Sequence, residues 1–403
     1  MNILVIITTG RAEFKSTIDM LVKNISNFGH FGKHSIGLLV NYDTSFLNLK
    51  PEDFVYSGEY ASLFTEINYL GNKDIEKYNE QMVNRGISSE VASFLCQKQG
   101  YSNKKNLALI EAIRRDYDIA LFWDDDEYPF VCSNSLTGLT WAATDILGAH
   151  LIAYEQHAAD LAFGFYTGYA SPIPLRLSSA ISDGLADSLG KALSIASDVA
   201  KGDTFRNSEG IFKSLEQDKL EIREIGMIDG GKWISGGNLS VRIESIVRGV
   251  VPPYFTPPHT RADDTILSMQ LQNAKVWQIP AGIFHDAFLE YRSIGLRDFP
   301  SSLIVVPEID PLQLQRFGKA LYGWLGYAPI FLRIKYGSSY KQYIEQMCEH
   351  LTIADSYMRK ELPLLEELYK HKSLPSILLD FDSKTEYNFE MMNKCYSEWN
   401  KIL

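Results

Sequence analysis

The chain has 403 residues, of which 45% are hydrophobic and 22% are charged, and its formal net charge is −11. This length permits two or three domains with a large buried core. The negative charge argues against a general surface for nucleic acids or other polyanions, although it is compatible with a local basic pocket. The four cysteines are scattered and lack metal-ligand spacing, which predicts a reducing compartment and no disulfide bond.

The first apolar run, within residues 1–11, has strand length and lacks the basic start and small-residue cleavage site of a signal peptide. A second apolar region, residues 139–169, is interrupted by polar groups such as Asp145, His150 and Asp160, which argue against a membrane span. We therefore expect a cytoplasmic protein that is at most peripheral to the inner face of the membrane.

The first third of the chain alternates between segments with strand character and segments with helical spacing of apolar residues. The predicted strands are residues 3–8, 35–40, 64–70 and 119–123. The predicted helices are residues 14–28, 73–97 and 104–115. This alternation predicts a parallel, doubly wound sheet.

The apolar segment 119–123 stops at four consecutive acids, Asp124, Asp125, Asp126 and Glu127. Five apolar residues in a row are typical of a parallel strand that is covered on both faces. The acids would then lie at the carboxyl edge of the sheet, where open α/β sheets bind ligands. Clustered carboxylates there suit a divalent cation and the phosphates it carries. The alternative is an acidic, solvated loop or a helix N-cap.

Thr8, Thr9, Gly10 and Arg11 end the first predicted strand and are expected at the same sheet edge as the acids. They bring hydroxyls, a flexible turn and a guanidinium to that edge. Arg11 is a candidate for nucleotide contact, and the alternative is a surface arginine near a turn.

Residues 131–228 are interpreted as an excursion from the sheet. The predicted elements of the excursion are a helix at 139–151, a strand at 161–166 and a helical stretch at 179–201. The excursion could cover an active site or bind an acceptor. The spacing of Leu185, Leu189 and Leu193 is more typical of simple packing.

Residues 230–242 set two glycine pairs around Lys232 and Trp233, and Asn238 follows the second pair, Gly236 and Gly237. Glycine lets a backbone approach a ligand closely, although glycine pairs also form ordinary turns. The segment is therefore a candidate wall of a binding site.

Asp263 and Asp264 precede a short helix with apolar periodicity. They could cap that helix, which explains one aspartate better than two. A carboxylate fixed at a helix start beside a sugar-sized cleft could instead serve as a general base. A further strand over 276–284 is predicted to end at His285, whose imidazole can join carboxylates around Mn²⁺, while Mg²⁺ prefers oxygen.

In this order the segments resemble the GT-A glycosyltransferases, particularly the large family-2-like group. The residues that carry the resemblance are Thr8, Thr9, Gly10, Arg11, Lys105, Asn106, Asp124, Asp125, Asp126, Gly236, Gly237, Asn238, Asp263, Asp264 and His285. The chain departs from the family pattern at Asp263, where a glutamate is common, at Thr9 and Gly10, and in the long excursion. The resemblance implies a Rossmann-like, doubly wound mixed sheet in a catalytic domain over residues 1–306, followed by a mainly helical region over 307–403.

The resemblance further implies a metal-dependent, inverting transfer of a sugar from a nucleotide-sugar donor to a hydroxyl group. A UDP-sugar is favoured over a GDP-sugar, and the acceptor would be a glycan, a glycoconjugate or a lipid-linked glycan. Asp126, Asp124 and His285 would hold Mn²⁺ or Mg²⁺, and Asp264 would be the general base with Asp263 as its rival. The implied donor-binding residues are Thr8, Thr9, Arg11, Lys105, Asn106, Asp124, Asp125, Trp233, Gly236, Gly237 and Asn238.

Two other functions are compatible with the acids. A sugar-phosphate nucleotidyltransferase also places acids on a doubly wound sheet, but the turn after the first strand lacks the glycine-rich, basic loop that would cradle a triphosphate. A non-catalytic protein that binds nucleotide sugars is the second alternative, and the presence of both metal-type acids and a candidate base argues against it.

The C-terminal region contains a basic and aromatic segment, residues 316–335. This segment could lie on a membrane surface and meet a lipid-linked acceptor. Docking onto the catalytic domain is favoured, because Gly318, Gly323, Gly326 and Pro329 interrupt the segment.

Overall fold

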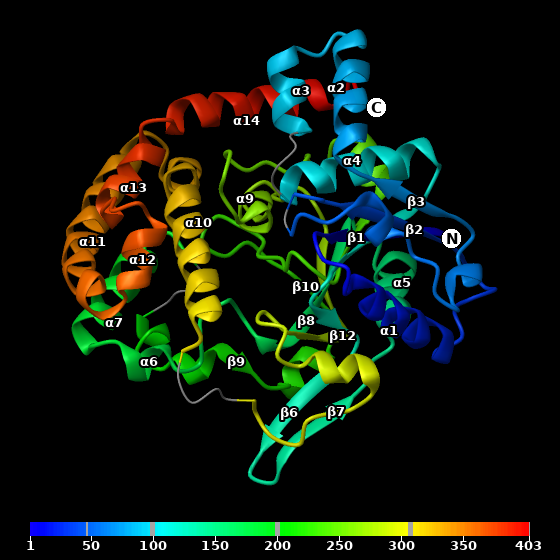
Figure 1. Cartoon of the computed structure of the whole chain (residues 1–403). Helices are drawn as coiled ribbons and strands as arrows, with labels where there is room; N and C mark the ends of the chain where they lie inside the picture. Colours follow the sequence, from blue (N-terminus) through cyan, green and yellow to red (C-terminus); the bar gives the residue numbers. More distant parts are fainter. Residues whose placement is uncertain (46, 97–100, 198–201, 305–308, 403) are drawn as a thin grey trace.

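A twisted mixed β-sheet forms the centre of one half of the molecule, and an arc of helices forms the other half (Figure 1). The computed structural model describes residues 1–45, 47–96, 101–197, 202–304 and 309–402. The order of strands across the sheet is β10-β12-β8-β11-β4-β1-β2-β3. These strands are β1 (Asn2–Thr9), β2 (Ser35–Tyr42), β3 (Ile67–Leu70), β4 (Ile119–Asp124), β8 (Leu161–Tyr169), β10 (Arg223–Glu224), β11 (Leu239–Arg242) and β12 (Val276–His285).

The sheet is parallel from β4 through β1 and β2 to β3, and β11 runs antiparallel to both of its neighbours, β4 and β8. Two short strands extend it, because β5 (Glu127–Tyr128) pairs with β12 and β9 (Phe212–Lys213) pairs with β8. A separate hairpin consists of β6 (Val131–Ser135) and β7 (Gly138–Ala142). The predicted α/β class with a doubly wound mixed sheet is therefore confirmed.

Helices cover both faces of the sheet. Alternate side chains of a strand point to opposite faces, so successive residues of one strand pack against different helices. Ile3 and Val5 of β1 pack in the core with α1 (Phe14–Asn27) and α5 (Ile146–Gln156). Leu4 and Ile6 pack in the core with α4 (Tyr101–Arg114), α8 (Ile243–Val247) and α9 (Asp263–Ser268). The other helices that precede the C-terminal region are α2 (Asn72–Asn84), α3 (Ser89–Leu95), α6 (Leu177–Ala180) and α7 (Asp183–Leu193). Of these, α6 and α7 lie with the arc of helices (Figure 1).

Three sequence-based assignments need correction. The predicted helix over 73–97 is two helices, because Gly86 has a φ of 84° and Ser88 caps a new helix by accepting a hydrogen bond from the Val91 amide; residue 97 lies outside the described residues. The predicted helix over 139–151 begins only at Ile146, and the residues before it form β7. Residues 131–228 are not one continuous excursion: the hairpin of β6 and β7 leaves the sheet, but α5 and β8 return to the sheet layers, and β8 lies between β11 and β12. Residues 198–201 of the predicted helical stretch also lie outside the described residues.

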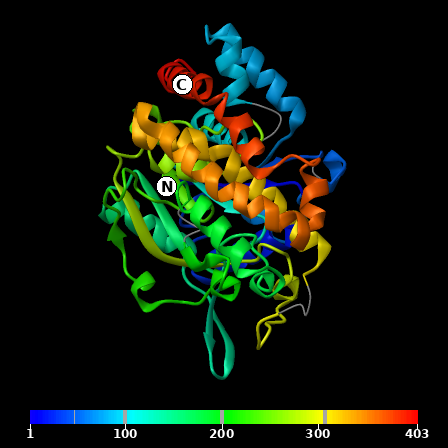
Figure 2. The ribbon, with the colours of Figure 1, turned by 90° about the vertical axis from the view of Figure 1, so that its left-hand side faces the viewer.

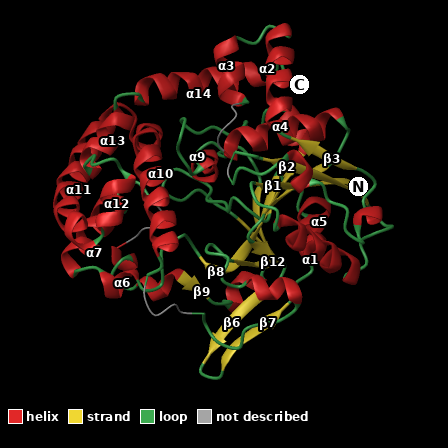
Figure 3. Ribbon diagram, viewed as in Figure 1, coloured by secondary structure: helices red, strands yellow, loops and turns green. Residues whose placement is uncertain are grey.

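The C-terminal region is helical, as predicted, and it forms the arc on the left of Figure 3. The helices of this region are α10 (Pro311–Tyr336), α11 (Lys341–Glu361), α12 (Pro363–Leu368), α13 (Leu374–Asp382) and α14 (Thr385–Trp399). Figure 2 shows the arc from its outer side, with the long α11 across the face turned to the viewer. The predicted domain boundary between 306 and 307 falls within 305–308, outside the described residues.

The basic segment docks onto the rest of the molecule, as predicted, since many side chains of α10 are buried. The expected interruption of this segment is wrong, because α10 runs as one 26-residue helix through Pro329. Its glycines instead allow close contact with neighbours. A Cβ atom on Gly318 would crowd Leu365, and one on Gly323 would crowd Arg261. No helix in the described part of the chain is long and apolar enough to cross a membrane. The four cysteines are free, as predicted.

Candidate active site

The ends of three strands meet beside a cavity of about 190 Å³. Thr8 of β1 lies opposite Asp124 of β4 in the parallel register, and His285 at the end of β12 pairs with Glu127 of β5. The cavity is lined by Thr8, Lys105, the three consecutive aspartates, Gly236, Asp263, Asp264, His285 and Arg316, among others. The predicted convergence of acids, the first-strand turn and the histidine at one sheet edge is thus what the fold produces.

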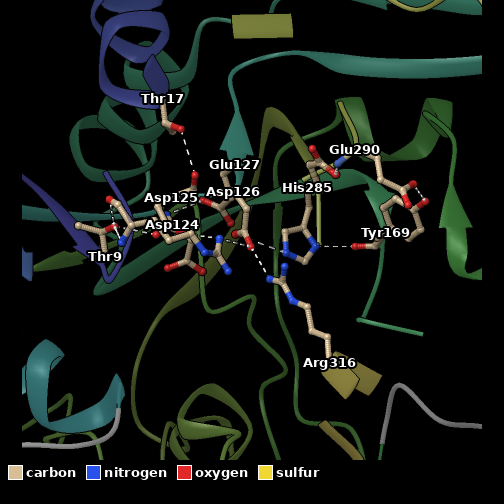
Figure 4. Close-up of polar contacts among 12 residues, drawn as sticks. Thr9, Thr17, Asp124, Asp125, Asp126, Glu127, Tyr169, His285, Glu290 and Arg316 are labelled. Atoms are coloured by element: carbon tan, nitrogen blue, oxygen red, sulfur yellow. Dashed lines mark hydrogen bonds and ion pairs between the residues drawn. The ribbon is translucent and has the colours of Figure 1, made fainter. Parts of the chain in front are cut away.

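Asp125 ties the acidic segment to the turn after β1. Its Oδ2 accepts a 2.7 Å hydrogen bond from Thr9 Oγ1, and its Oδ1 lies 2.8 Å from Nη1 of Arg11 (Figure 4). Burial raises the pKa of Asp125 to about 7, with a further contribution from the negative charge of Asp126. Thr9 and Arg11, predicted to bind the donor, are therefore engaged in bracing this carboxylate.

Asp126 is surrounded by positive groups. Its Oδ2 lies 3.1 Å from Nη2 of Arg316 and 3.5 Å from Nη1 of Arg11, and its Oδ1 lies 3.7 Å from Nε2 of His285. Burial alone would raise the pKa of Asp126, but His285, Arg11 and Arg316 outweigh burial and lower it below its ordinary value. Asp126 is therefore held as a carboxylate.

His285 is oriented by a backbone carbonyl. Its Nδ1 lies 2.5 Å from the carbonyl oxygen of Tyr169, so Nδ1 carries the hydrogen of this bond and Nε2 is the ring nitrogen that faces Asp126. Metal-binding histidines usually have such a partner on the second ring nitrogen.

Within the described ranges, no three His, Cys, Asp or Glu side chains form a group that could hold a metal ion. Two of the three predicted ligands, Asp126 and His285, do face each other. Two protein ligands fit a Mg²⁺-like or Mn²⁺-like ion that takes its other ligands from substrate phosphates and water.

Lys105 links Asp263, at the start of α9, to the backbone of Gly236. Its Nζ lies 2.8 Å from Oδ2 of Asp263 and donates a 3.1 Å hydrogen bond to the carbonyl oxygen of Gly236. Burial would lower the pKa of Lys105, but the charge of Asp263 and nearby groups outweighs burial and raises it. Asp263 is therefore paired with a buried cation.

Asp264 lies on the cavity side of the same helix start. Its Oδ1 accepts a 2.9 Å hydrogen bond from the Thr265 amide, and a Cβ atom on Gly236 would lie 3.1 Å from its Oδ2. Helix α9 has Ala262 as its N-cap residue, with a φ of 67°, and no side chain caps it. Asp264 thus accepts from one amide of the first helical turn, and the helix dipole favours both carboxylates there, but neither aspartate occupies the N-cap position.

No protein-family model and no curated protein sequence matches this chain. Among solved structures, it is similar to TarS 1–349 of S. aureus in complex with UDP-GlcNAc, with a TM-score of 0.39, 12% identity and coverage of 98% of this chain and 92% of that chain. It is also similar to the mannosyltransferase PcManGT of Pyrobaculum calidifontis in complex with GDP-Man and Mn²⁺, with a TM-score of 0.38, 11% identity and coverage of 98% and 85%.

Six of the eleven predicted donor-binding residues do not line the cavity, namely Thr9, Arg11, Asn106, Trp233, Gly237 and Asn238. Asn106 is fully buried and uses its side chain on the backbone of Tyr254, accepting from its amide at 2.8 Å and donating to its carbonyl at 2.9 Å. Trp233 packs against Phe331 of α10 and lines a neighbouring cavity of about 350 Å³. The expected contacts of these two side chains with a donor are therefore not supported by their positions.

Glu127 was not singled out from the sequence, yet it shapes the site. Its Oε2 accepts a 3.1 Å hydrogen bond from the Asp124 amide, and its carboxyl group packs directly against Gly237. Burial raises the pKas of Asp124 and Glu127, and the mutual repulsion of these carboxyls raises that of Glu127 further. The sequence signal was present, because Glu127 is the fourth acid of the run.

Gly237→Ala is expected to destabilise the fold by about 1–3 kcal/mol, the usual scale for overpacking a core, since its new methyl group would overlap the Glu127 carboxyl. Gly226→Ala is the matched control, because a Cβ atom there has no neighbour within 4 Å. Denaturant unfolding of both variants measures the effect. Equal stabilities for the two variants would contradict the close packing of Glu127 on Gly237.

Asn238 has a φ of 46°, and its side chain belongs to a buried polar network. Its Nδ2 donates to the Ala281 carbonyl at 2.8 Å, and its Oδ1 accepts from Nε2 of His150 at 3.0 Å. Ser240 completes the network, with its Oγ 2.7 Å from Nδ1 of His150. Asn238 thus fixes the backbone that follows Gly236 and Gly237.

The stability of the protein is expected to depend on His150 in mildly acidic solution. Burial lowers the pKa of His150 to about 4, whereas an unfolded histidine has a pKa of about 6.5. Between these values the unfolded state binds the extra proton, so stability falls as the pH falls from about 6.5 to about 4, by about 3 kcal/mol in total.

Unfolding free energies measured between pH 7 and pH 4.5 test this dependence. His150→Gln should lose this component of the pH dependence, because glutamine does not titrate. His371→Gln, which replaces an exposed histidine, should retain it. An unchanged slope in His150→Gln would show that His150 is not the responsible group.

Proposed function

We propose that the protein is a metal-dependent, inverting glycosyltransferase of the GT-A type that moves a sugar from a nucleotide sugar to an acceptor hydroxyl. The observation that carries the proposal is the placement of Asp126, His285 and Asp264 on one cavity at the carboxyl edge of the sheet. This arrangement supports two separate tasks, holding a diphosphate-bound cation and removing a proton from an acceptor. The sequence resemblance to GT-A glycosyltransferases supports the same reaction.

The acidic segment would bind the donor. Asp124, at the end of β4, would contact the nucleoside, and Asp126 with His285 would hold Mn²⁺ or Mg²⁺ against the diphosphate. When bound, the ion neutralises the charge that develops on the leaving diphosphate. Arg11 would keep the Asp125 carboxylate in place through their ion pair, and so would hold the acidic segment in position when the ion binds next to it.

Asp264 would act as the general base. Its carboxylate lines the cavity beside Gly236. In an inverting transfer it would face an acceptor hydroxyl that attacks the anomeric carbon from the side opposite the diphosphate. Removal of the hydroxyl proton by a positioned carboxylate accelerates such an attack. Asp263 would have the supporting task, because its ion pair with Lys105 fixes the start of α9.

A panel of nucleotide sugars tests the proposal most directly. With Mn²⁺ present, one UDP-sugar, or failing that one GDP-sugar, is expected to be hydrolysed slowly and consumed faster when glycan acceptors or lipid-linked acceptors are added. Pyrophosphate release from a nucleoside triphosphate and a sugar phosphate would instead support a sugar-phosphate nucleotidyltransferase. Tight binding of a nucleotide sugar without turnover of any acceptor would support a non-catalytic binding protein.

A further inference from the structure

Arg316 enters the catalytic cavity from the C-terminal region, 190 residues after Asp126 in the sequence. It lies in the second turn of α10, and its guanidinium points toward Asp126 and His285 (Figure 4). Its Nη2 lies 3.1 Å from Oδ2 of Asp126, and its Cζ lies 6.0 Å from the centroid of the Phe288 ring. A helix outside the sheet therefore supplies one of the cations of the site.

The start of α10 is held firmly against the rest of the molecule. Phe317, the next residue, is fully buried and contacts Phe205, with ring centroids 6.2 Å apart. The hydroxyl of Tyr369 donates a 2.8 Å hydrogen bond to the carbonyl oxygen of Gly318. Gln313, one turn earlier, donates to Glu290 in the segment that follows His285. The backbone of Arg316 is thus fixed, and its long side chain extends from α10 to Asp126.

The three cations nearest the acids differ in exposure. The side chain of Lys105 is 5% exposed and that of Arg11 is 10% exposed, whereas that of Arg316 is 31% exposed. Lys105 is engaged by Asp263, and Arg11 is engaged by Asp125 at 2.8 Å. Arg316 is therefore the most exposed of the three, and its partner Asp126 is the carboxylate that is predicted to take the divalent ion.

We propose that Arg316 binds the diphosphate of the donor, an inference that rests on the proposed function. A divalent ion and Arg316 compete for the same Asp126 carboxylate, so binding of the ion would release the guanidinium toward the phosphates. The planar fork of arginine matches phosphate oxygens with two parallel hydrogen bonds. The C-terminal helices would thereby complete the active site as well as cover it.

An alternative is that the Arg316–Asp126 pair only anchors α10 to the sheet. The two roles predict different results. An anchoring role would lower thermal stability and weaken all nucleotides equally, whereas diphosphate binding weakens a nucleoside diphosphate more than the matching monophosphate.

Isothermal titration calorimetry with Mn²⁺ and with UDP or UMP separates these roles, with GDP and GMP replacing them if the donor is a guanine nucleotide. Arg316→Met is expected to weaken UDP binding about tenfold to a hundredfold, the scale of charge-assisted hydrogen bonds, and UMP binding by less than about threefold. Arg316→Lys should lose less, because it keeps the charge without the fork. Lys319→Met, an exposed position on the same helix, should bind both nucleotides like the wild type.

The outcomes also distinguish this inference from the proposed function. Failure of the wild-type protein to bind any nucleoside diphosphate would overturn the proposed function itself. Wild-type affinity for UDP in Arg316→Met would overturn the role of Arg316 alone. Equal losses for UDP and UMP would show anchoring in its place. Arg316→Gln provides the same comparison if Arg316→Met does not fold.

Discussion

Asp264→Asn is expected to lower sugar transfer by about a hundredfold or more, the usual scale for general-base catalysis, while the protein folds and binds nucleotide nearly as the wild type does. Asparagine keeps the shape of the side chain and can still accept the hydrogen bond from the Thr265 amide. Its amide does not take up a proton at neutral pH. Initial rates of transfer, thermal unfolding and calorimetric titration with a nucleoside diphosphate measure the three quantities separately.

Asp263→Asn is the matched comparison, and its expected defect is of another kind. This change leaves the ammonium group of Lys105 buried without its carboxylate partner, so thermal stability should fall. Transfer per folded molecule should fall less than in Asp264→Asn. Normal turnover in Asp264→Asn together with a collapse in Asp263→Asn would move the base by one residue. Normal turnover in both variants would point to a mechanism without a protein base at this helix.

The strands and the site edge could be predicted because both depend on local pattern. The apolar run that becomes β4 and the acids after it follow one another directly, and the parallel register of β1 with β4 brings Thr8 opposite Asp124. The same reasoning placed His285 at the end of β12. Each of these residues lies where a strand ends, and the sequence marks that point by a change from apolar to polar residues.

The errors arose where an interaction between distant segments decides the outcome. Residues 139–142 have apolar residues compatible with helix, but they pair with β6 instead, and the helix starts where Asp145 caps it by accepting from the Gly148 amide. The glycines of α10 suggested a broken segment, whereas they allow contacts with Arg261 and Leu365 that no local pattern reveals. From the sequence, Arg316 is only one residue of a basic segment, because its contact with Asp126 joins positions 190 residues apart.

The charges around Asp126 lead to the second large effect. In the wild type this carboxylate repels a diphosphate unless a cation is bound, so Mn²⁺ is expected to strengthen binding of a nucleoside diphosphate by roughly tenfold or more. Asp126→Asn removes the charge that holds the ion and leaves Arg11 and Arg316 in place. The variant should therefore bind the diphosphate with nearly the same affinity in the presence and absence of Mn²⁺.

The direction of the metal-free change makes this prediction specific. Without Mn²⁺, Asp126→Asn should bind the diphosphate more tightly than the wild type, because a repulsive charge is gone and two guanidinium groups remain nearby. With Mn²⁺, it should bind more weakly than the wild type. Calorimetric titrations of both proteins in Mn²⁺ and in chelator give the four affinities, and Asp203→Asn, at an exposed aspartate, should repeat the wild-type pattern. If Mn²⁺ strengthens binding equally in the wild type and in Asp126→Asn, the ion is held elsewhere, and Asp126 serves instead to position Arg316 and His285.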